Sequence, residues 1–142
     1  MVQTKIVQGI LLLFLGINSI RDIRKREIFL PLTLAGIAAG GLYTALTEGF
    51  TRSRICAVGI GSCFIAVSLL SSSQFGMGDA LALTVLGTVL SPEELVFVLG
   101  LSFFLAFLVS AFLLLKDKAT RKERIPFLPF LLAGYLGEVL LW

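Results

Sequence analysis

The sequence predicts an all-α, polytopic integral membrane protein with about six transmembrane helices. The first observation behind this prediction is composition, because 57% of the 142 residues are hydrophobic and only 15% are charged. The second is that the charged residues form short clusters between long apolar runs. A water-soluble domain has about 25% charged residues, so we expect a single membrane-embedded domain over residues 1–142.

Six apolar segments define the expected helices. They cover about residues 4–21, 28–47, 55–72, 80–90, 95–115 and 125–142. A helix that crosses the bilayer core needs roughly 20 residues, and about 17 are tolerated. The fourth segment is too short to span unaided. We expect it to gain length from "QFGMG" or "SPEE", or to stop partway inside the protein.

The distribution of lysine and arginine predicts the orientation in the membrane. The first and fifth connectors hold nine of these residues, whereas the opposite side has three, Lys5, Arg52 and Arg54. Basic connectors stay in the cytoplasm, so we expect the first, third and fifth connectors there and both chain ends outside. The asymmetry largely vanishes if the fourth segment does not span, so the count favours six spans. It also accounts for the net charge of +3 without nucleic-acid binding.

The residue content excludes several kinds of site. Histidine is absent and no CxxC occurs, which removes the usual zinc sites and any Ser-His or Cys-His nucleophile pair. Cys56 and Cys63 lie one heptad apart in an apolar segment, roughly 10 Å on a helix, which is too far for a disulfide. We expect both to be small buried hydrophobes. We therefore expect no metal and no cofactor.

Small residues recur at positions where helices would meet. Gly36 and Gly40 form a GxxxG pair, and Gly59 with Gly61 marks the third segment. Such spacing lets helix backbones approach closely in a membrane, so we expect these glycines at helix contacts.

Two aspartates lie at membrane boundaries. Asp22 ends the first segment in "INSIRDIRKREI", and Asp79 opens the fourth in "FGMGDALAL". The expected topology places both at the cytoplasmic interface, although 57 positions separate them. Two carboxylates that share one proton can activate a water and protonate a leaving amine, which is the chemistry of aspartic proteolysis. The third aspartate, Asp117, lies in the basic connector "KDKATRKER" and is expected to be an ordinary surface charge.

Each aspartate taken alone also has a structural explanation. Asp22 can pair with Arg26 at i+4, and Asp79 can cap the fourth helix. The convergence of both on one membrane face, with a glycine-x-glycine turn before Asp79, favours a functional pair. Gly76 and Gly78 have no Cβ, so they allow positive φ and a close approach of the backbone to a neighbouring helix or an extended substrate.

These residues resemble a known family of membrane proteases. "GMGD" matches the GxGD signature of intramembrane-type aspartyl proteases, and the whole arrangement is similar to type IV prepilin peptidases. That family has a pattern like D-x-x-x-R-x-I-P-N. "DIRKREIFLPLTL" keeps Asp22, Arg26 and Ile28 but has Phe29 where proline is usual. "RIPFLPFLLAGYL" at 124–136 resembles the family's I-P-F-x-P-F sequence before the last helix.

The resemblance implies a membrane endopeptidase that cleaves the short basic leader of prepilin-like proteins at the cytoplasmic face, as in type IV pilus assembly and protein secretion. It implies that Asp22 and Asp79 are the catalytic pair and that Gly76 and Gly78 shape the turn. Arg26 and Pro126 are candidates for supporting roles.

The chain also departs from the family pattern. Long members carry an N-terminal domain with paired cysteines and methylate the new N-terminus. This chain lacks that domain, so we expect cleavage without methylation. The family often has a lysine two residues after the second aspartate, where this chain has Leu81.

Two alternatives to a prepilin peptidase stay open. One is a non-enzymatic membrane transport or assembly subunit, in which the aspartates are caps and ion-pair partners. The other is a GxGD protease with a different signal-peptide-like substrate, although Arg21 stands where that class has an aromatic residue before the first aspartate. The expected partners are a prepilin-like substrate and the lipid bilayer, and the sequence does not predict an oligomeric state.

Overall fold

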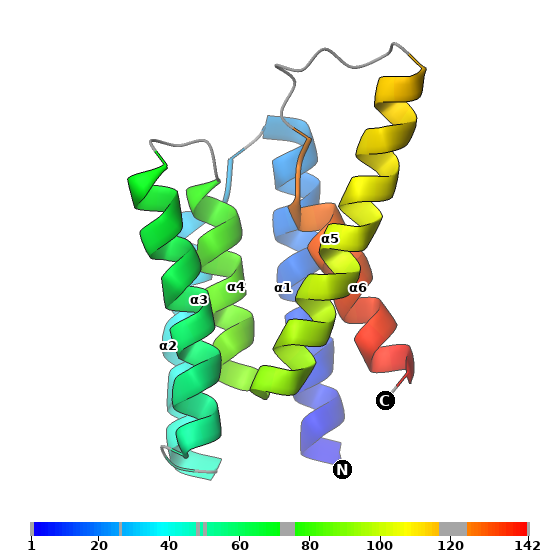
Figure 1. The fold of residues 1–142 in the computed structure, drawn as a ribbon. Coiled ribbons are helices and arrows are strands. Elements are labelled where there is room, and N and C mark those ends of the chain that lie inside the picture. The colour runs from blue at the N-terminus through cyan, green and yellow to red at the C-terminus, as the bar shows by residue number, and fades with distance from the viewer. Residues whose placement is uncertain are drawn as a thin grey trace.

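The computed structural model describes residues 2–25, 27–47, 49, 51–71, 76–116 and 125–141. Within these ranges the chain forms six α-helices and no strand, which confirms the all-α prediction (Figure 1). The helices are α1 (Val2–Lys25), α2 (Leu30–Thr47), α3 (Arg52–Leu70), α4 (Met77–Val89), α5 (Pro92–Leu115) and α6 (Leu128–Leu141). Four of them, α1, α2, α3 and α5, are long and apolar enough to cross a membrane.

Helix α4 is as short as the sequence predicts and is enclosed by protein. Its 13 residues extend over about 20 Å, less than the roughly 30 Å of a hydrocarbon core. Residues 82–88 are all buried. At the far end of α4, the Thr44 hydroxyl donates to the Thr88 carbonyl and the Arg54 guanidinium donates to the Val89 carbonyl. The helix therefore ends inside the protein with its last carbonyls hydrogen-bonded, as backbone at membrane depth requires.

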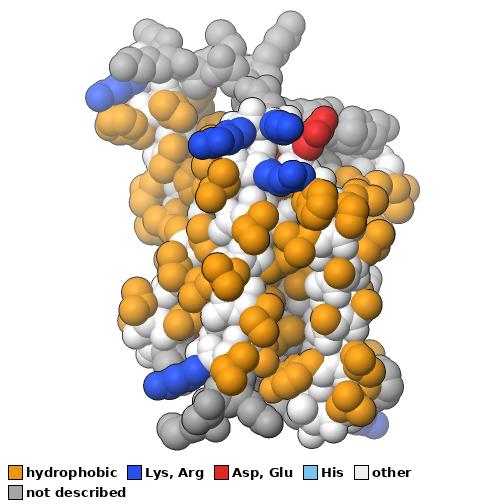
Figure 2. Space-filling model, turned by 180° about the vertical axis from the view of Figure 1, so that it is seen from behind, with side chains coloured by type: hydrophobic (Ala, Val, Ile, Leu, Met, Phe, Trp, Pro, Cys, Tyr) orange, Lys and Arg blue, Asp and Glu red, His pale blue; other side chains and the backbone are white. Residues whose placement is uncertain are grey.

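Successive helices alternate in direction, so the end of α1 and the start of α4 lie at the same end of the bundle (Figure 1). We call this the aspartate end, because Asp22 and Asp79 are located there. Exposed basic side chains also gather at this end, where α1 closes with Arg21, Arg24 and Lys25. Figure 2 shows Lys and Arg near the two ends of one face and hydrophobic side chains between them.

The six helices pack as two groups of three. Helices α2 and α3 pack on α4, and helices α1 and α5 pack on α6, whereas lesser contacts join α5 to α3 and α4 (Figure 1). We call these the α2–α3–α4 group and the α1–α5–α6 group. The chain passes from one to the other after α1 and again at Ser91, whose side chain and Glu94 form a capping box at the start of α5. Two crossings therefore connect the groups covalently.

Glycines bring the backbones together inside each group. A Cβ on Gly61 of α3 would be 2.7 Å from the Cα of Thr84 in α4, and one on Gly134 of α6 would be 2.7 Å from the Val98 carbonyl oxygen in α5. Gly40 of α2 lies against the side chain of Thr88, whose Cβ would be 3.1 Å from a Cβ on this glycine. These positions confirm the expected helix contacts, apart from Gly59, which has no neighbouring element of the described chain within 4 Å.

Long side chains fill the space between the two groups. Leu11, Phe14 and Leu15 of α1 and Leu83 and Leu86 of α4 are buried in a single hydrophobic cluster. This junction therefore rests on side-chain packing, in contrast to the backbone contacts within the groups.

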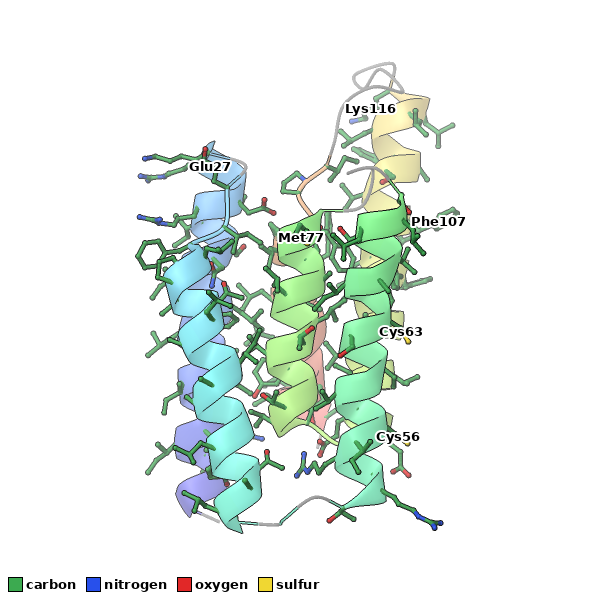
Figure 3. The ribbon with its side chains drawn as sticks, turned by 90° about the vertical axis from the view of Figure 1, so that its left-hand side faces the viewer. Glu27, Cys56, Cys63, Met77, Phe107 and Lys116 are labelled. Carbon is green, nitrogen blue, oxygen red and sulfur yellow. The ribbon has the colours of Figure 1, made fainter. Side chains whose placement is uncertain are left out.

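The expectation for the cysteines is half right. Neither Cys56 nor Cys63 forms a disulfide, but both are exposed on the outer side of α3, away from α4 (Figure 3). Burial was the wrong inference, because the outer surface of a membrane bundle is as apolar as its interior.

Candidate active site

Asp22 lies on the buried face of α1. Its spacing from Leu11, Leu15 and Asn18 corresponds to i, i+4, i+7 and i+11, so all four residues share one helix face. Leu15 and Asn18 are fully buried. Asp22 itself is partly buried, and its Oδ2 atom is buried. The sequence of α1 therefore directs this carboxylate inward at the end of the bundle.

Asp79 is the third residue of α4 and shares its inward face with Leu83 and Leu86. It is partly buried, and its Oδ2 atom lies 2.7 Å from the position that a Cβ on Gly76 would occupy. A side chain on Gly76 would thus displace the carboxylate. The helix N-terminus also favours a negative charge at this position.

The glycines act through close approach and not through unusual backbone angles. Gly76 caps α4 with φ −61°, and Gly78 is in the first turn of the helix. The positive φ that these glycines allow is therefore not used, because α4 begins directly after Gly76 and both glycines have ordinary backbone angles. Any Cβ on Gly78 would overlap the side chain of Ile28. The expected close approach to a neighbouring segment is thus present at Gly78, whereas Gly76 lies close to the Asp79 carboxylate of its own helix.

The Ile28–Gly78 contact explains how the two aspartates meet. Ile28 belongs to the connector after α1, so this connector lies directly against the first turn of α4. The Asn18 side chain holds the connector by accepting a hydrogen bond from the Phe29 amide at 3.4 Å. The Arg21 guanidinium adds a contact, 4.4 Å from the centre of the Phe29 ring. Figure 3 shows Glu27 of this connector and Met77 of α4 at the same end of the bundle.

The result is a pair of interacting carboxylates. Asp22 is close enough to Asp79 for their negative charges to repel when both are ionised. The structure thus brings together the two aspartates that the sequence singled out, one from each helix group. Two carboxyl groups whose charges interact titrate as a pair, and such a pair can perform acid–base chemistry on a water molecule.

The structure describes only some of the other residues that the sequence analysis singled out. Arg26 and Asp117 lie outside the described residues. Pro126 is partly buried two positions before α6, and the following Phe127 packs against Phe103 with ring centres 5.1 Å apart. Pro126 is therefore located at the start of the last helix, and its supporting role stays a prediction. Leu81, at the position where the family has lysine, is partly buried within α4.

A second acidic cluster was not singled out from the sequence. Glu138 is 3% exposed and Tyr135 is fully buried in α6, and Glu94 of α5 is close enough to interact with both. Glu138 Oε2 and Tyr135 Oη have no hydrogen-bond partner among the described residues. The sequence feature that could have indicated this cluster is a glutamate inside the apolar run "AGYLGEVLL". No group of three or more Asp, Glu, His or Cys suited to a metal ion occurs in the described part of the chain.

The fold and this site define a class of protein, a polytopic membrane protein with a dicarboxylate site at one end of its bundle. Residues 9–112 match the Type IV leader peptidase family, so the chain belongs to this family of membrane peptidases. The matched range includes Asp22, Asp79 and the glycines of the GMGD motif. No curated protein and no solved structure matches the chain.

Proposed function

We propose that the protein is a membrane aspartic endopeptidase that removes the leader peptide of prepilin-like proteins, with Asp22 and Asp79 as its catalytic residues. The observation that carries the proposal is that Asp22 and Asp79, 57 positions apart in sequence, lie at the same end of the bundle and close enough for their charges to interact. Membership of the leader peptidase family supports the substrate class.

The proposed reaction uses one ionised and one protonated carboxyl group. The ionised group takes a proton from a water molecule, whose oxygen attacks the carbon of the scissile peptide bond. The protonated group donates its proton to the carbonyl oxygen. When the tetrahedral intermediate collapses, the C–N bond breaks and the leaving nitrogen takes up the proton that came from water. The catalytic roles can exchange between the two residues, because coupled carboxylates titrate as a pair.

We further propose that cleavage takes place at the cytoplasmic face. The exposed Arg21, Arg24 and Lys25 at the aspartate end support this orientation. The proposal covers peptide cleavage without methyl transfer, since the carboxylate pair supplies acid–base chemistry only. Gly76 and Gly78 would keep the start of α4 close to Asp79 and to the connector.

Co-expression with a candidate prepilin tests the proposal. We expect Asp22→Asn and Asp79→Asn each to lower leader removal by roughly 10²- to 10⁴-fold. An immunoblot should show that both variants accumulate as the wild type does. Asp117→Asn is the matched control and should cleave normally. If both site variants process the substrate at the wild-type rate, the aspartates are structural and the proposal is wrong.

A further inference from the structure

A groove lies between α1 and α2, with α4 as its floor. Its volume is about 440 Å³, and its lining is almost entirely apolar. The wall residues include Ile10 and Ile17 from α1 and Ala35 and Ala39 from α2, and Val85 and Val89 form part of the floor. We call this the α1/α2 groove. The proposed carboxylate chemistry does not use it.

The groove lies below the carboxylate pair along the bundle axis, on faces of α1 and α4 that adjoin the faces carrying the two aspartates. It runs along α1 from Val7 to Ile17, a length of about 15 Å. Ile17 is five residues from Asp22, a rise of roughly 7.5 Å along α1, and Val85 is six residues from Asp79, roughly 9 Å along α4. Both helices that carry the aspartates therefore line the groove, and its upper end lies within two helical turns of them.

The walls have the shape of a helix-binding surface. Exposed alanines on α2 leave room on one side, and Ile10, 59% exposed, and Leu13, 69% exposed, rise on the other. Phe14 of α1 also lines the groove and lies 3.5 Å from the position of a Cβ on Gly36 in α2. Small residues facing large ones accept a ridge of side chains from a third helix.

We propose that the α1/α2 groove binds the apolar helical segment of the substrate that adjoins its leader. This inference rests on the proposed function and names the part of the substrate that the enzyme grips. Measured along the helix axes, a helix lying in the groove ends roughly 7 to 9 Å below the level of the carboxylates. Two or three extended residues cover that rise at about 3.3 Å each. The groove therefore fixes the distance between the substrate helix and the bond that is cut.

Two neighbouring alanines of α2 give a matched test. Ala38 and Ala39 are both exposed, but only Ala39 lines the groove. We expect Ala39→Phe to slow cleavage of a membrane-embedded prepilin-like protein by about 10- to 10²-fold. Ala38→Phe should cleave it at the wild-type rate. Both variants should process a short soluble peptide, made of the leader and the first mature residues without the apolar helix, as the wild type does.

The outcomes separate this inference from the proposed function. If Ala39→Phe cleaves the embedded protein as fast as Ala38→Phe does, the groove is not the binding site, although the peptidase proposal stands. If Ala39→Phe is slow on the short peptide as well, the effect is not on helix binding and the inference is overturned. Failure of the wild type to cleave either substrate would contradict the peptidase proposal itself.

Photocrosslinking tests the groove without relying on cleavage. A benzophenone side chain replaces Ile10 in the groove or Phe104 on the outer face of α5, which have matched exposures of 59% and 58%. In the Asp79→Asn protein, we expect an adduct with the embedded prepilin-like protein from position 10 only. Adducts with lipid alone, or equal protein adducts from both positions, would overturn the inference.

Discussion

The two kinds of helix interface in this molecule differ in what makes the contact. Within each group, a glycine brings one backbone against another, as at Gly61 and Thr84 or at Gly134 and Val98. Between the groups, large side chains such as Leu15 and Leu83 belong to one buried hydrophobic cluster. Lipid is as apolar as leucine, so close backbone packing is the more specific way to join helices in a membrane.

The candidate active site lies at the junction between the two helix groups, where large side chains make the contact. Asp22 belongs to the α1–α5–α6 group and Asp79 to the α2–α3–α4 group, so the carboxylate pair exists only when the groups are correctly placed. The α1/α2 groove lies along the same boundary. The tightly packed groups thus serve as supports, and the junction between them carries the proposed chemistry and substrate contact.

The largest expected effect tests the glycine contacts inside a group. Gly61→Leu should destabilise the protein by about 3 kcal/mol or more, because the new side chain would force α3 away from α4. Gly59→Leu on the same helix is the control and should have little effect, since that position faces open space. Thermal unfolding in detergent measures both. Equal stability of the two variants would contradict the distinction between the interfaces.

A smaller effect is expected where the groups meet at the site. Gly78→Ala should lower leader cleavage about tenfold, equivalent to about 1.4 kcal/mol, because its Cβ collides with Ile28 and shifts the connector that follows Asp22. Ile28→Ala should restore activity in the double variant by removing the colliding atoms. Cleavage assays on the wild type, the two single variants and the double variant form a double-mutant cycle. Additive losses instead of rescue would show that the Ile28–Gly78 contact does not set the site geometry.

The smallest effect concerns the Glu138 carboxyl group, which is buried within the α1–α5–α6 group. Glu138→Gln should raise the free energy of unfolding by about 1 kcal/mol, because a carboxylate oxygen without a partner among the described residues is replaced by a neutral group. Glu93→Gln, on the exposed side of the first turn of α5, is the control; it removes a charge that the helix N-terminus favours and should lower the free energy of unfolding by at most about 0.5 kcal/mol. Thermal unfolding checks both variants. A clear loss of stability in Glu138→Gln would show that the carboxylate makes a contact that the group needs.

Much of the fold follows from local sequence patterns. Apolar runs between basic clusters predict six helices, and α2, for example, ends at Thr47 as expected. The location of Asp22 and Asp79 at the same end of the bundle also follows from sequence, because counting spans puts both residues there. Their closeness does not follow from it, since it depends on how α1 and α4 pack. The backbone angles of Gly76 were not predictable, since they depend on where α4 begins.

Features that depend on packing between distant segments escaped prediction. Ile28 and Gly78 were both noted as motif residues, but nothing in either motif indicates that they touch. The exposure of Cys56 and Cys63 depends on which face of α3 meets α4, and an apolar helix gives no sign of it. The α1/α2 groove likewise results from how three helices are spaced, which no single segment encodes.

The hydrogen bonds at the far end of α4 have a consequence for the position of cleavage. Thr44 of α2 and Arg54 of α3 hold the last carbonyls of this helix, and Asp79 is near the opposite end. A helix resists compression along its axis, so its 13 residues set the height of Asp79 above that fixed point. The depth at which the enzyme would cut its substrate is thus determined on the far side of the protein, by the length of one buried helix.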